Sequence, residues 1–166
     1  MILTGDKIKK ENKKGNIGIR PFCDEQVNPN SYNYRLGKSL KELESFKDSK
    51  PVFKEIEIPK EGYVLNPKKL YLGHTSEIIG SNKYSMSLIG RSSLGRLGLY
   101  LQISANLGHV TSSHKWTLEL VALKPIIVYP EMIIGQVSFW KNYGKIDKFK
   151  SVYIKQDKPL ESQLGL

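Results

Sequence analysis

The chain has 166 residues and a formal net charge of +10, with 26 Lys and Arg residues against 16 Asp and Glu residues. The length suits one domain with one sizeable core, and 39% hydrophobic with 25% charged residues is typical of a soluble globular protein. The positive charge favours anionic partners such as nucleotide phosphates, while the scattered lysines make nucleic-acid binding a minor alternative.

The single cysteine, Cys23, cannot form an internal disulfide, which fits a reducing cytosol and predicts a cytoplasmic protein. We find no signal peptide and no apolar run long enough to span a bilayer, so no membrane association is expected. Zinc deaminases combine a His-x-Glu motif with Cys-x-x-Cys, and neither motif occurs in this sequence. No metal site built from protein ligands is therefore expected.

The N-terminal third is predicted to contain one short helix followed by extended segments. Thr4 is suited to cap a lysine-rich helix over residues 5–14, and Gly15 to end it. Only Ile8 would point inward from this helix, so its packing is expected to be light. Extended segments are predicted at 17–19 and 32–36, separated by a loop that contains two prolines.

Residues 38–52 are polar and allow two interpretations. The run from Ser39 to Glu42 has the spacing of a capping box and predicts a short helix, whereas the polar composition equally fits an exposed loop insertion. Beyond it, alternating apolar residues predict short strands at 53–58, 63–65, 70–72, 84–89, 126–129 and 132–140. A spacing near ten residues with Gly, Pro and Asn between strands predicts an all-β sandwich or barrel without a second domain.

A strand is predicted at 116–123, with one carboxylate in its middle. Leu118 and Leu120 fall on one face, whereas Glu119 shares the other face with Val121 and Leu123. A carboxylate between apolar neighbours has a raised pKa when it is desolvated and can then act as a general base. The alternative is a solvent-exposed Glu on an edge strand.

The segment 90–98, Gly-Arg-Ser-Ser-Leu-Gly-Arg-Leu-Gly, carries the other chemical groups. Ser92 or Ser93 could cap a short helix, whose start suits a phosphate, and Arg91 and Arg96 add charge and bidentate donors. A capped turn with two solvated arginines is the competing interpretation.

Taken together, segment 90–98, Ala105 and Thr117-Leu118-Glu119-Leu120 resemble the signature of the dCTP deaminases of the dUTPase-like superfamily. Similarity extends, in order, over nearly the whole chain, including Met1–Asp6, Gln26–Gly37, Lys124–Pro130 and Ile134–Phe139. The resemblance implies a distorted jelly-roll or β-barrel of the dUTPase-like type with one or two short helices. It also implies a homotrimer with active sites between subunits, in which the tail 141–166 of a single domain 1–166 closes over the site.

The resemblance also implies roles for individual residues. Glu119 would be the general base and proton shuttle for metal-independent hydrolytic deamination, with Ser92 holding the water and Arg96 beside the reacting base. The substrate-binding residues would be Arg91 and Ser93 at the phosphates, Ala105 at the pyrimidine, and Tyr153 and Gln156 in the tail. Mg²⁺ would arrive on the substrate triphosphate.

The chain departs from the family in the loop before Glu119. His109 stands where the family carries an aspartate that binds the 3′-hydroxyl and, in bifunctional relatives, orients the water that attacks phosphate. The expected function is therefore deamination of dCTP or a related cytosine nucleotide to the uracil nucleotide. The alternatives are a nucleotide-binding regulatory protein without efficient turnover, or a dUTPase-type triphosphate diphosphohydrolase.

We expect His109 to be one of the substrate-binding residues. The substitution His109→Asp tests the effect of this departure from the family. A neutral imidazole can accept one hydrogen bond but loses this capacity when it is protonated, so we expect weak discrimination for plain deoxyribose and no dUTP hydrolysis. The aspartate should improve dCTP turnover in steady-state assays with dCTP and dUTP. Unchanged kinetics for both nucleotides would place His109 outside the site, and efficient dUTP cleavage by the unmodified protein would show that another residue positions the attacking water.

Overall fold

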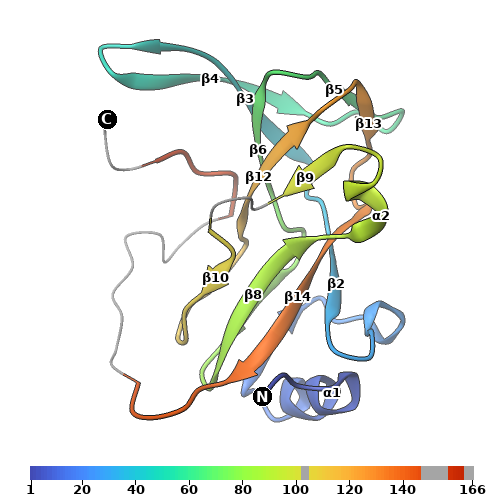
Figure 1. Ribbon diagram of the computed structural model, residues 1–166, viewed down its shortest axis with the longest axis vertical. Helices are drawn as coiled ribbons and strands as arrows, with labels where there is room; N and C mark the ends of the chain where they lie inside the picture. The colour runs from blue at the N-terminus through green and yellow to red at the C-terminus, as the bar shows by residue number, and fades with distance from the viewer. Residues whose placement is uncertain (102–104, 147–156, 163–166) are drawn as a thin grey trace.

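The computed structural model describes residues 1–101, 105–146 and 157–162, and Figure 1 shows these as short antiparallel strands with little helix. A five-stranded sheet has the order β4-β3-β6-β12-β9, and a four-stranded sheet has the order β10-β8-β14-β2. The all-β prediction is confirmed. The strands of these two sheets are β2 Tyr32–Arg35, β3 Ser39–Lys47, β4 Lys50–Glu57, β6 Leu70–His74, β8 Tyr84–Gly90, β9 Leu99–Leu101, β10 Leu107–Gly108, β12 Thr117–Ala122 and β14 Ile133–Lys141.

Two smaller sheets complete the fold. One has the order β1-β7-β11 and the other pairs β13 with β5. Both main sheets contribute to a single hydrophobic core, in which Tyr71 and Leu120 from one sheet and Tyr34 and Phe139 from the other are fully buried. The remaining elements are α1 Gly5–Lys13, β1 Ile17–Arg20, the 3₁₀ turn η1 Asp24–Gln26, β5 Tyr63–Leu65, β7 Ile78–Ser81, α2 Ser92–Gly95, β11 Ser113–His114 and β13 Ile126–Val128.

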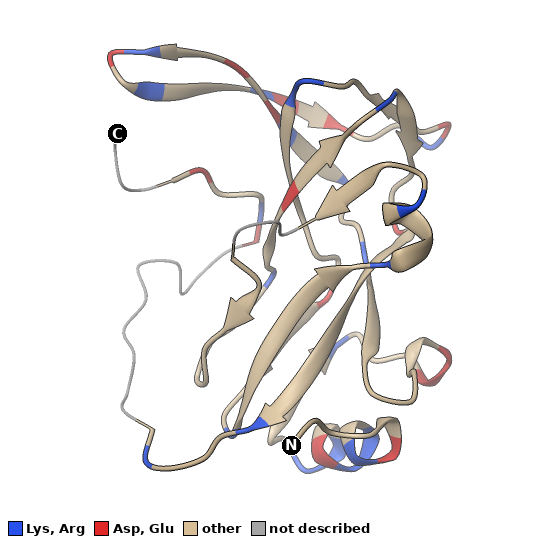
Figure 2. Cartoon of the chain, viewed as in Figure 1, with Lys and Arg blue, Asp and Glu red and all other residues tan. Residues whose placement is uncertain are grey.

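Helix α1 begins at Gly5 as predicted and ends at Lys13, one residue earlier than predicted. Thr4 is at the N-cap position but its side chain makes no capping hydrogen bond, and Gly15 lies beyond the end at φ +75°. Its packing differs from the prediction, because Glu11 is buried beside Ile8. The Glu11 carboxylate accepts hydrogen bonds from Asn16 and Tyr84 and pairs with Lys7 at 3.0 Å. Lys7, Asn16 and Tyr84 hold the pKa of Glu11 at about 2. Acidic residues lie among the lysines of the helix in Figure 2, so α1 is not a uniformly basic surface.

Both interpretations of residues 38–52 were wrong. This segment forms β3, a tight turn and the first residues of β4, which pair as a hairpin (Figure 1). Lys47 pairs with Lys50, which leaves Asp48 and Ser49 as a two-residue turn with φ of 50° and 60°. These values match the type I′ turn that suits a twisted hairpin. Glu42, the expected capping residue, instead points inward, where Tyr63 and Lys69 bind its carboxylate.

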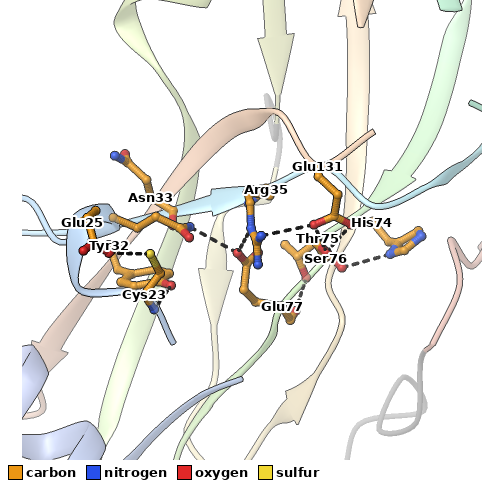
Figure 3. A network of polar contacts seen from close by, with 11 residues as sticks. Cys23, Glu25, Tyr32, Asn33, Arg35, His74, Thr75, Ser76, Glu77 and Glu131 are labelled. Carbon is orange, nitrogen blue, oxygen red and sulfur yellow. Dashed lines mark hydrogen bonds and ion pairs between the residues drawn. The ribbon is translucent and has the colours of Figure 1, made fainter. Parts of the chain in front are cut away.

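A buried polar network ties the sheets together around Glu77, which is completely inaccessible to solvent (Figure 3). The guanidinium of Arg35 on β2 donates from Nε to Glu77 Oε1 at 2.7 Å, and the Arg35 backbone N–H donates to Oε2 at 2.9 Å. Gln26 donates to the same carboxylate at 3.2 Å. A buried carboxylate is tolerated only when its oxygens are paired in this way.

The same network reaches the turn before β14. Arg35 also lies 3.4 Å from Glu131, whose carboxylate accepts from the Ser76 hydroxyl at 2.7 Å. Thr75 donates its hydroxyl to the Glu77 backbone carbonyl and accepts from the Trp116 backbone N–H. The segment 75–77 is therefore fixed against η1, β2, the start of β12 and the turn at Glu131.

Glu77→Gln should lower the free energy of unfolding by about 3 kcal/mol, because it leaves the Arg35 guanidinium without its buried counter-charge. Glu131→Gln is the matched control, since its side chain is 36% exposed and faces the same arginine. It should cost less than about 1 kcal/mol. Urea unfolding of both variants at neutral pH measures the difference. Equal decreases in the free energy of unfolding would show that the buried pair contributes no more to stability than the exposed pair.

Candidate active site

The arginine-serine segment forms the one-turn helix α2 at the protein surface. The N-cap is Arg91 rather than Ser92 or Ser93, and its side chain makes no capping hydrogen bond. Its backbone carbonyl instead accepts from the N–H groups of Leu94 and Gly95. The predicted serine cap is thus wrong. Ser92, Ser93 and Arg96 are exposed. Two hydroxyl groups and one guanidinium are therefore accessible to a ligand at this surface.

Glu119 lies in the middle of β12, as predicted, on the face that points away from the core. Leu118 and Leu120 are fully buried, whereas Glu119 and Val121 are only partly buried within one chain. The neighbours of Glu119 in its own strand therefore do not desolvate it in the way the sequence suggested. Its environment is decided by the adjacent strands and by what covers this face of the sheet.

Strand register shows which side chains share the face of Glu119. Glu119 pairs with Leu72 on β6, and Leu72 pairs in turn with Lys41 on β3, so these three form one row across the sheet. Thr117 pairs with His74 in the next row. Side chains in register on adjacent strands point to the same side of a sheet. Leu72 and His74 are only 7% and 6% exposed, so the central part of this outer face, on β6, is covered.

A cavity of about 640 Å³ opens at the His74 end of this face, and it is lined mainly by β3, β4 and residues 157–159. His74 contacts the Thr75 carbonyl from Nδ1 at 2.9 Å and lies 3.3 Å from the Ser39 hydroxyl at Nε2. Burial lowers the pKa of His74, so the neutral ring donates from Nδ1 and accepts at Nε2. Gly37 packs directly on this ring, because a Cβ there would lie 1.9 Å from a ring carbon.

Within one chain, the C-terminal end of the α2 segment is apart from Glu119. Gly98, at the end of the α2 segment, accepts a hydrogen bond from Leu123, which is four residues beyond Glu119 on β12. Four residues of extended strand span about 13 Å. Among the ion pairs between described residues, none joins Arg91 or Arg96 to Glu119.

The remaining predicted residues lie elsewhere. Ala105 and His109 are exposed, and His109 stands in the turn between β10 and β11, where Thr111 has φ +75°. Tyr153 and Gln156 lie outside the described residues. Sequence reasoning missed the contribution of Lys41, Leu72 and His74 to the face of Glu119, because only the register between β3, β6 and β12 reveals it.

Two further observations concern the described parts of the chain. No three His, Cys, Asp or Glu side chains there come together in a way that could hold a metal ion. Over the same residues, no helix is long and apolar enough to cross a membrane.

These antiparallel sheets define an all-β fold of the dUTPase-like type, with a carboxylate on the sheet face that points away from the core. A profile described as dCTP deaminase-like matches residues 2–142, and the chain belongs to this family. A crystal structure of 2′-deoxycytidine 5′-triphosphate deaminase from Agrobacterium tumefaciens superposes with a TM-score of 0.69 over 88% of this chain. The chain matches half the length of that structure at 19% identity, which is a likeness of fold.

Relatives that are closer in sequence cover the chain almost completely. A protein from Clostridium beijerinckii named "dCTP deaminase, dUMP-forming" is 40% identical over 99% of this chain and 96% of its own length. A protein from Hathewaya histolytica with the same name is 44% identical over 91% of this chain and 89% of its own length.

Proposed function

We propose that this protein hydrolytically deaminates a cytosine nucleotide, dCTP or a close relative, in the cytoplasm. The observation that carries the proposal is the position of Glu119 in the middle of β12, on the sheet face that points away from the core, in a chain of the dCTP deaminase-like family. In the proposed reaction, water adds to C4 of the cytosine ring, and the C4–N bond breaks to release ammonia. The product is the uracil nucleotide.

Glu119 would act as general base and proton shuttle. Its carboxylate takes a proton from the attacking water and returns it to the ring and to the leaving amino group, so that one group serves both steps. Ser92 would hold the water, and Arg96 would stabilise charge beside the base. Arg91 and Ser93 would bind the phosphates, the Ala105 backbone the pyrimidine, and Tyr153 and Gln156 would contact the nucleotide from the tail.

Mg²⁺ would enter on the triphosphate of the substrate. Phosphate oxygens are the hard ligands that Mg²⁺ prefers, and the ion commonly binds with few protein ligands of its own. Its proposed part is to neutralise phosphate charge beside Arg91 and Ser93. The reaction would need no zinc, since the Glu119 carboxylate would carry out the proton transfers.

A second candidate function comes from the names of the relatives. Both compared proteins are named dUMP-forming, which adds release of diphosphate to deamination. His109 bears on this step, because it replaces the aspartate that the family resemblance assigns to the phosphate-attacking water. We propose deamination without this cleavage. Chromatography of the products formed from dCTP distinguishes dUTP from dUMP.

The separation of α2 from Glu119 supports a site shared between subunits of a homotrimer. Around α2 and the strand β9 beside it, Leu97, Tyr100 and Leu123 are between 41% and 67% exposed. A cluster of large exposed apolar side chains is typical of an interaction surface. A second copy seated there would bring an α2 segment to the Glu119 face of its neighbour.

Glu119→Gln should abolish deamination while the fold is retained, because the amide keeps the size of the side chain and cannot take a proton. Loss of a general base typically costs about 10²- to 10⁴-fold in rate. Ammonia release from dCTP, with Mg²⁺ and a zinc chelator present, measures the effect, and circular dichroism checks the fold. Turnover close to that of the unmodified protein would rule out Glu119 as the base.

Mixing two inactive variants tests the shared site. If Glu119 and Arg96 of one site come from different chains, an equimolar mixture of Glu119→Gln and Arg96→Ala chains regains about a quarter of the activity, since random pairing completes one interface in four, and the trimers that contain both variants regain about a third. Light scattering should give the mass of a trimer. Activity that stays absent in confirmed mixed oligomers would place both residues of a site in one chain.

A further inference from the structure

The C-terminal segment 157–162 lies across the sheet face that carries Glu119. The backbone N–H of Leu160 donates to the hydroxyl of Thr117 at 3.1 Å, two residues before Glu119 on the same face. Pro159 is buried and lines the cavity together with His74. The segment is therefore attached to β12 beside the proposed base.

A second attachment lies on the other side of the same row. The Lys41 ammonium donates to the Glu161 carboxylate at 2.6 Å. Lys41 and Glu119 are the residues on either side of Leu72 in its row. Strands in a sheet are about 4.8 Å apart, so the backbones at Lys41 and Glu119 are separated by about 10 Å. The segment thus bridges β12 and β3 beside the row that contains the proposed base.

The ion pair is well placed to hold the segment. The Lys41 side chain is only 16% exposed, and the hydrogen bond from Lys41 is the main cause of a lowered pKa at Glu161. A partly buried charge-assisted hydrogen bond is stronger than a solvent-exposed pair. The other carboxylate near Lys41, Glu55, is 3.8 Å away on a side chain that is 74% exposed, so Glu161 is its principal partner.

We propose that Lys41 and Glu161 form a latch that holds the C-terminal segment of a chain across the sheet face that carries its own Glu119. Lys41 is then a positioning residue for the nucleotide site, an inference that rests on the proposed deaminase function. The latch assigns the segment to the chain that supplies the base, and it closes one wall of the space above Glu119. Opening the latch should weaken nucleotide binding more than it slows the chemical step, because Glu119 itself is untouched.

Charge reversal tests the latch. Lys41→Glu and Glu161→Lys should each raise KM for dCTP about tenfold with kcat changed less than about threefold, as expected for loss of one charge-assisted hydrogen bond. The double variant, which exchanges the two charges, should recover most of the loss. Lys47→Glu is the matched control, because it makes the same charge change at an exposed position of the same strand. It should leave both constants unchanged.

A readout independent of catalysis follows the segment directly. Hydrogen exchange of the Leu160 amide, measured by NMR, should become faster in each single variant, return in the double variant and stay unchanged in Lys47→Glu. Unaltered exchange or unaltered KM in the single variants would overturn the latch. If exchange responds as expected but the unmodified protein releases no ammonia from any cytosine nucleotide, the proposed function fails while the attachment of the segment stands.

Discussion

The structure depends on one buried carboxylate. Glu77 is completely inaccessible to solvent, and its two oxygens are bound by the Arg35 side chain and backbone and by Gln26. A charge in this position is tolerated only while every partner is in place, so the geometry is specified tightly. Because the segment 75–77 continues directly from β6, the network fixes the end of the strand that sets the register of β12.

The position of Glu119 follows from that register. Leu72 aligns Glu119 with Lys41, and His74 aligns with Thr117, which is the residue that binds the C-terminal segment. The network and the proposed base are thus connected through one short strand. A change in the pairing of β6 by one residue would turn the face of Glu119 into the core, because side chains alternate along a strand.

The same scaffold separates the groups that the proposed chemistry needs. The hydrogen bond from Leu123 to Gly98 ties α2 to the far end of β12 from Glu119. One chain therefore offers a carboxylate face and, at a distance, an exposed turn with serines and arginines. Because of this division, a second chain of the proposed homotrimer would have to bring its α2 segment to the carboxylate face. The C-terminal segment is attached to the carboxylate face and not to the exposed turn.

Local patterning alone determined the all-β class, the helix that begins after Thr4, and most strands, because period-two alternation and turn residues act over a few residues. It also placed Glu119 on the opposite face of β12 from Leu118 and Leu120. Strand β3 was not predicted, because Ser39 and Glu42 satisfy a helix-start pattern that pairing with β4 and β6 overrides. Only the tertiary structure decided which side chains share the sheet face of Glu119, because Leu72, Lys41 and the C-terminal segment come to this face through strand register and chain return over long sequence separations.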